Sequence, residues 1–181
     1  MWPFKSVDEK AKKFPPALVS IVAEISPHFV SALYGGENRD KEKESINREI
    51  LAFSLHLTDR IVYSLGTKDR DIFMDNLILE MEIMLRRANV ASVFDYYDKR
   101  IVFYSKFIKT SYSRSEPPGG TLCFEFGKSL VSLYGEAKDE PIWRRNLAGE
   151  ASKARHISDL AVLLYGFITE ALVREKIVTG E

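Results

Sequence analysis

Apolar residues recur at intervals of three and four along most of this chain, the spacing that places side chains on one face of an α-helix. The stretch from Glu44 to Gly66 shows this pattern most strongly. Its first face carries Ile46, Ile50, Phe53, Leu57 and Ile61, and its opposite face carries Leu51, Leu55 and Val62. A helix that is apolar on nearly all sides is usually central to its domain. The pattern therefore predicts a central helix, with three polar residues at the margin of its first face: Glu49, His56 and Arg60.

The same spacing predicts helices on both sides of this central one. They cover about 15–33, 71–88, 92–111, 122–134 and 141–176, and the last is either unbroken or bent near Gly149. Glycine and proline separate them, most clearly in the run from Tyr112 to Gly120. No stretch alternates apolar and polar residues with the period of a strand. The sequence therefore predicts an all-α, single-domain bundle of about six helices.

The chain of 181 residues is long enough for one domain with a substantial core and short for two. We expect residues 1–14 to form a flexible lead-in, residues 15–177 to form the domain, and residues 178–181 to form a tail. Small residues in the first half of the last helix, such as Ala151 and Ala154, would allow a close approach to a neighbouring helix.

Two parts of the chain resemble each other. The segment from Val30 to Gly66 begins VSALYGG and ends HLTDRIVYSLG, while the segment from Val131 to Gly166 begins VSLYG and ends HISDLAVLLYG. The match aligns His56 with His156, Asp59 with Asp159, and Gly66 with Gly166. Two related helix pairs, the product of an internal duplication, would explain it. The competing explanation is that helix ends commonly carry glycine and helix interiors commonly carry leucine and valine.

Charge and cysteine content restrict the function further. Lysine plus arginine equals aspartate plus glutamate at 26 each, which argues against a general binder of nucleic acid. The single cysteine, Cys123, cannot form an internal disulfide, so we expect a cytoplasmic protein. The early apolar run from Ala17 to Tyr34 contains Glu24, Pro27 and His28, so no transmembrane segment is expected. Trp2 and Phe4, beside several lysines, allow weak membrane-surface contact by the N-terminus.

The two His-x-x-Asp motifs give one functional hypothesis. A helix places both side chains of such a motif on neighbouring turns of one face. His56, Asp59, His156 and Asp159, together with Glu49, would then bind a divalent transition metal in the bundle interior. Metal-binding bundles of the di-metal type use Glu-x-x-His instead, and a helical histidine is more often satisfied by a nearby acid or carbonyl group. We therefore prefer the interpretation that the histidines are structural and bind no cofactor.

The helix over 92–111 gives the leading hypothesis. Phe94, Tyr97, Ile101, Tyr104 and Ile108 form an aromatic seam at helical spacing. Additional side chains on other faces would form an exposed strip for a protein partner or a second copy: Tyr96, Arg100, Phe103 and Phe107. Such a mixture of cations and aromatics can also stack single-stranded nucleic acid, but the neutral overall charge argues against it.

Catalytic signatures are missing from the sequence. It contains no Gly-x-Ser-x-Gly, no phosphate-binding glycine-rich loop after a strand, and no Cys-x-x-Cys. Asp59-Arg60 and Asp69-Arg70 are interpreted as surface or interhelical ion pairs. The sequence therefore favours a non-catalytic interaction or regulatory module that forms a homo-oligomer or binds a protein partner, with the metal-binding bundle as the alternative.

Overall fold

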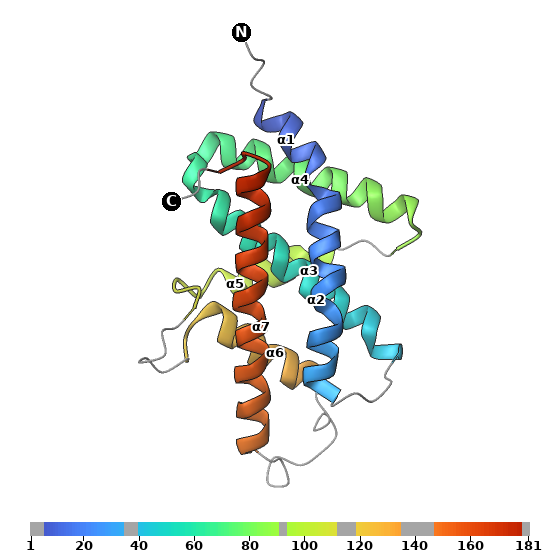
Figure 1. The fold of residues 1–181 in the computed structure, drawn as a ribbon, viewed down its shortest axis with the longest axis vertical. Coiled ribbons are helices and arrows are strands. Elements are labelled where there is room, and N and C mark those ends of the chain that lie inside the picture. The colour runs from blue at the N-terminus through green and yellow to red at the C-terminus, as the bar shows by residue number, and fades with distance from the viewer. Residues whose placement is uncertain (1–5, 35–39, 91–93, 112–118, 135–146, 179–181) are drawn as a thin grey trace.

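The helices of this protein form where the apolar spacing is continuous. A computed structural model describes residues 6–34, 40–90, 94–111, 119–134 and 147–178, and within these ranges it contains helices and no strand (Figure 1). The elements are α1 (Val7–Lys13), α2 (Pro15–Tyr34), α3 (Asp40–Val62), the 3₁₀ turn η1 (Tyr63–Leu65), α4 (Thr67–Arg87), α5 (Phe94–Tyr104), α6 (Leu122–Tyr134) and α7 (Leu147–Arg174). The prediction of an all-α single-domain bundle is confirmed.

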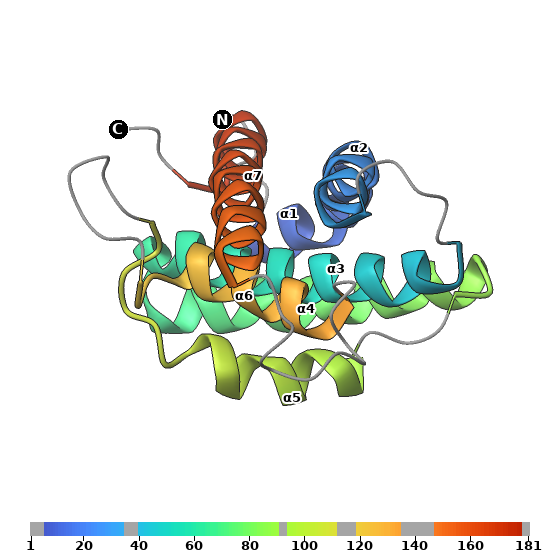
Figure 2. The ribbon, with the colours of Figure 1, turned by 90° about the horizontal axis from the view of Figure 1, so that it is seen from below.

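The helices stack in layers around α3. Helices α2 and α7 run side by side above α3, α4 and α6, and α5 lies on the far side of α3 (Figure 2). Helix α3 contacts α2, α4, α5, α6 and α7. Every residue from 49 to 59 is buried, which includes residues of both predicted faces. The prediction that this helix is central is therefore confirmed.

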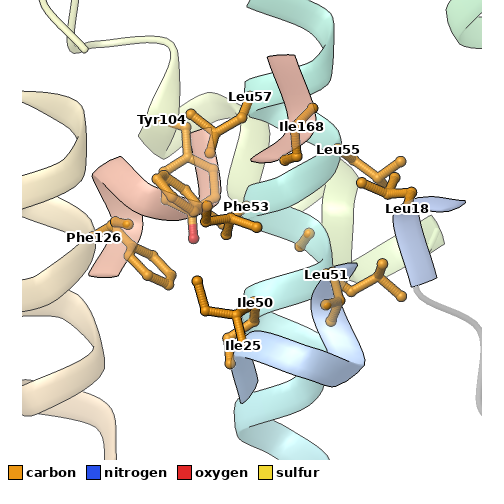
Figure 3. Packing of buried hydrophobic residues seen from close by; sticks show 14 of the residues in the cluster. Leu18, Ile25, Ile50, Leu51, Phe53, Leu55, Leu57, Tyr104, Phe126 and Ile168 are labelled. Carbon is orange, nitrogen blue, oxygen red and sulfur yellow. The ribbon is translucent and has the colours of Figure 1, made fainter. Parts of the chain in front are cut away.

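Aromatic rings from four helices fill the middle of the core. The Phe53 ring of α3 stacks on the Phe126 ring of α6 with centroids 3.9 Å apart (Figure 3). The Tyr104 ring of α5 lies edge-on to the Phe53 ring, with centroids 5.2 Å apart. The Phe29 ring of α2 meets Phe126 at 5.7 Å. Edge-on and offset contacts of this kind add to the stabilisation from burial. They join α2, α3, α5 and α6 into one core.

Three predicted boundaries need correction. Part of the expected lead-in forms α1, capped by Ser6 and packed on α4, because Ala11 and Phe14 are fully buried. Val178, expected in the C-terminal tail, is also buried. Helix α5 ends at Tyr104 and does not continue to Ser111, so Ile108 leaves the expected seam and is 95% exposed.

The two segments that resemble each other both form helix pairs, α2 with α3 and α6 with α7. Their aligned residues differ in surroundings. Gly66 follows η1 with a positive φ of 82°, whereas Gly166 lies inside the unbroken helix α7. The internal duplication stays a prediction.

Within the described residues, two helical stretches are long and apolar enough to cross a bilayer by length and composition, namely Val7–Tyr34 and Gly149–Arg174. In each, 39% of the most apolar window is buried within the protein. Core helices of soluble proteins have the same property, so this composition decides little in either direction. The cytoplasmic location stays a prediction.

Helices α6 and α7 approach each other closely at Gly127, as the small residues of α7 allow. A Cβ atom added to Gly127 would lie 2.4 Å from the backbone carbonyl oxygen of Ala154. The close atom belongs to the backbone of α7, so it cannot move aside as the end of a flexible side chain can. We therefore expect Gly127→Ala to force the two helices apart and to lower the free energy of unfolding by about 1–3 kcal/mol, measured by urea denaturation.

Gly166→Ala is the matched control for this variant. Gly166 also lies within a helix, but a Cβ there would meet nothing within 4 Å. Alanine is the better helix former, so this variant should gain about 0.5–1 kcal/mol. Equal effects of the two substitutions would show that helix propensity, and not the close approach at Gly127, determines the outcome.

Candidate functional site

The buried carboxylate of Glu49 is the centre of a polar cluster between α3 and α5. The hydroxyls of Tyr96 and Tyr104 each donate a hydrogen bond to this carboxylate. The Arg100 guanidinium donates from Nε to Oε1 at 2.8 Å, and its Nη2 lies 2.6 Å from the same oxygen. Residues 96, 100 and 104 are spaced by four, so one stripe of α5 supplies all three donors. This Glu49 cluster anchors α5 to α3.

The cluster extends to a third helix. Arg100 Nη2 also donates to the Ser129 hydroxyl of α6 at 2.7 Å. The guanidinium further lies over the rings of Phe103 and Tyr104, 4.6 and 5.0 Å from their centroids. Burial raises the pKa of Tyr104 well above its ordinary value, so its hydroxyl remains a donor to Glu49. With its carboxylate held by three side chains, Glu49 serves as a structural acceptor.

In the last turn of α3, Arg60 binds the chain that follows α5. Its guanidinium donates to the carbonyl oxygens of Tyr104, Phe107 and Ile108, the last at 2.9 Å. Tyr104 is the last residue of α5, and Phe107 and Ile108 follow it, so these bonds fix the chain after α5 against α3. Arg60 Nε also donates to His56 Nε2 at 3.0 Å. Polar contacts of α3 therefore hold α5 along its middle and at its end.

The carboxylate of Asp59 binds an arginine of α4. Arg70 Nε and Nη2 reach its two oxygens at 2.8 and 2.7 Å, a bidentate pair. Asp59 forms an interhelical ion pair, as expected. Its partner is Arg70 of the next helix and not the adjacent Arg60. The pair fixes α4 against α3.

The five proposed metal ligands do not converge. Glu49 binds Tyr96, Arg100 and Tyr104, and Asp59 binds Arg70, while His156 and Asp159 are exposed on α7. Among the described residues, no group of three or more His, Cys, Asp or Glu side chains is placed to hold a metal ion. No observation in the described part of the chain therefore favours the metal-binding alternative.

The expected interaction strip on α5 is largely turned inward, which is a correction. Tyr96 and Arg100 point to Glu49, and Phe103 and Phe107 are partly buried against the core. The reason is the buried charge of Glu49, which draws one stripe of α5 toward α3. Substitution of Phe103 would thus disturb packing as well as any surface contact.

An open groove lies between α4 and α5, and it is the candidate contact site in place of the expected strip. Its volume is about 620 Å³. Four apolar side chains and four charged ones line it: Ile78, Leu79, Ile83, Phe94, Asp75, Glu82, Arg86 and Asp95. Leu79 is 56% exposed and Phe94 is 41% exposed, an unusual state for large apolar side chains that lie together. We call this the α4–α5 groove.

Glu82 connects the two walls of the α4–α5 groove. Its Oε1 accepts a hydrogen bond from the backbone N–H of Phe94 at 3.1 Å, and its Oε2 lies 3.8 Å from Arg86 Nε. Beneath the groove, Ile78, Glu82 and Phe94 also line a void of about 10 Å³ beside the buried Tyr97. The start of α5 is thus held in place by Glu82 and by the Glu49 cluster.

Sequence reasoning missed the groove, although a signal was present. Phe73, Leu77 and Met81 repeat at helical spacing along one stripe of α4, and these are buried. Leu79 and Ile83 lie off that stripe, so α4 has more apolar residues than one buried face uses. Such surplus apolar positions indicate a second contact face.

Nucleophilic chemistry finds no support at Cys123. The thiol is fully buried, and burial raises its pKa to about 12, so it is protonated at neutral pH. The residue packs in the core as a small hydrophobe. No family model, no curated protein and no solved structure matches the chain.

Proposed function

We propose that this chain is a protein-interaction module and that the α4–α5 groove is its contact site. The observation that supports this is the joint exposure of Leu79 and Phe94 above an apolar floor. Apolar grooves between two helices are typical receptors for an amphipathic helix of a partner. The Glu49 cluster then has a positioning role, because it holds the helix that forms one wall.

A neutral helical peptide tests this proposal directly. The probe is a labelled peptide about four turns long, with leucines spaced i, i+3, i+4 and i+7 and with glutamine and alanine elsewhere. We expect Leu79→Asp to weaken its binding at least about tenfold, measured by fluorescence anisotropy, because the substitution places a charge at the centre of the contact.

Val102→Asp is the matched control, since Val102 is exposed on α5 and does not line the groove. It should bind the peptide as the wild type does. Equal loss in both variants would mean that the peptide adheres to apolar surface in general. Undiminished binding by Leu79→Asp would contradict the proposal.

Self-association is a separate proposal. The chain has a mass of 20.7 kDa, so light scattering at several protein concentrations distinguishes a monomer from a dimer. If the groove is where a second copy docks, Leu79→Asp will reduce the measured mass and Val102→Asp will not. A mass that stays at the monomer value at every concentration would contradict self-association and leave the groove proposal open to the peptide test.

A further inference from the structure

The charges around the α4–α5 groove specify the partner further. Asp75, Glu82 and Asp95 contribute three negative charges and Arg86 contributes one positive charge, which leaves a net of −2 around the apolar floor. The whole chain has a net charge of zero, so this surface is more acidic than the average. Acidic rims attract cationic ligands and repel phosphate-bearing ones.

We infer that the partner of the α4–α5 groove is a cationic amphipathic helix. This inference rests on the proposed interaction function and adds the chemistry of the partner. Apolar side chains of the ligand would contact Ile78, Leu79, Ile83 and Phe94, and its lysines or arginines would pair with Asp75 and Asp95 at the rim.

The dimensions of the groove fit such a helix. The α4 wall extends from Asp75 to Arg86, twelve residues that span roughly 16 Å along the helix axis. Three turns of a partner helix cover the same length. Leu79 and Ile83 are one turn apart on this wall, so they match ligand side chains that repeat every three or four residues.

Arg86 does not block this interaction. Its side chain is 79% exposed, and its Nε lies 3.8 Å from a carboxylate oxygen of Glu82, whose own side chain is only 12% exposed. The long Arg86 side chain can turn to solvent, and cations of the partner would then pair with the exposed Asp75 and Asp95. Glu82 itself stays in position through the Phe94 backbone N–H.

Other classes of partner fit less well. Nucleic acid and anionic membrane surfaces both need a surplus of lysine and arginine at the contact. The lining of the groove has the opposite sign. The apolar floor also distinguishes this site from a simple acidic patch, because charge alone would not require Leu79 and Phe94 to be exposed.

Two peptides that differ only in charge test the inference. Both are about four turns long and share the leucine positions of the neutral probe; one carries lysine and the other glutamate on the polar face. We expect the lysine peptide to bind at least about tenfold more tightly than the glutamate peptide at low salt, and this preference should shrink as salt is added.

Charge reversal in the protein completes the experiment. The double variant Asp75→Lys/Asp95→Lys should lose or reverse the preference, whereas Asp98→Lys, exposed on α5 but outside the lining, should keep it. If both peptides bind equally to the wild type, the charge inference is overturned and the groove function stands. If neither charged peptide nor the neutral probe binds, both proposals are overturned.

Discussion

Glu49→Gln should lower the free energy of unfolding by about 3 kcal/mol, because it leaves the buried cation of Arg100 without its anionic partner. The glutamine keeps the size of the side chain but removes the charge that faces Arg100, whose side chain is only 17% exposed. It also replaces one carboxylate oxygen by an amide group that donates, opposite the donors Tyr96 and Tyr104. Urea denaturation at neutral pH measures the loss.

Glu44→Gln provides the comparison for this variant on the same helix. Glu44 pairs with Arg48 at 3.2 Å on the surface of α3, with the Glu44 side chain 71% exposed. Removal of such a pair should change stability by no more than about 0.5 kcal/mol. A double variant, Glu49→Gln/Arg100→Met, should recover part of the loss because no buried charge is left unpaired. Similar effects of Glu49→Gln and Glu44→Gln would refute the central role of the Glu49 cluster.

Acid should destabilise the protein through His56. Burial and the nearby guanidinium of Arg60 lower the pKa of this histidine from 6.5 to about 4, against a smaller opposite effect of Asp59. Its Nε2 accepts from Arg60, so a second proton would add a cation beside an existing one. In the unfolded chain the histidine takes up this proton near its ordinary pKa.

The sign and range of this effect follow from linkage. The folded-state pKa lies below the unfolded one, so the unfolded state binds more protons between about pH 6.5 and 4. The contribution of His56 is fully present above pH 6.5 and is lost as pH falls to about 4, for a total of about 3 kcal/mol. We expect His56→Gln, whose amide oxygen can accept from Arg60, to show a correspondingly shallower loss of stability over this range.

His156→Gln controls for histidine substitution, because His156 is exposed on α7. Its stability curve against pH should follow that of the wild type. Carboxylates titrate in all three proteins, so their effect cancels in the comparison. If His56→Gln and the wild type lose stability in parallel as pH falls, the buried neutral histidine is not the cause.

Both large effects arise at residues of α3, Glu49 and His56. Helix α5, which packs on them, forms one wall of the groove. Helix α5 packs mainly on α3, through Glu49 near its middle and through Arg60 at its end. Loss of either contact should therefore loosen the wall formed by Phe94 and Asp95. Peptide binding to Glu49→Gln, measured below its unfolding transition, reports this link between the buried cluster and the surface.

Much of the helical architecture was readable from residue spacing. The segment from Leu122 to Tyr134 was predicted with the bounds of α6, and the central helix was identified because both of its faces are apolar. The polar residues Glu49, His56 and Arg60 stood out for the same reason, since a polar residue on such a helix has little solvent to face. The small residues of the last helix were compatible with the close approach that the structure places at Gly127.

The sequence by itself determined the all-α class, the central helix and the presence of polar residues within it, because helical periodicity is a local property of the chain. Only the tertiary structure decided their partners: Arg100 and two tyrosines for Glu49, Arg70 for Asp59, and the carbonyl groups after α5 for Arg60. It also decided that Leu79 and Phe94 meet across a groove. These pairings join residues far apart in sequence, so they depend on how helices pack, which the spacing within one helix does not encode.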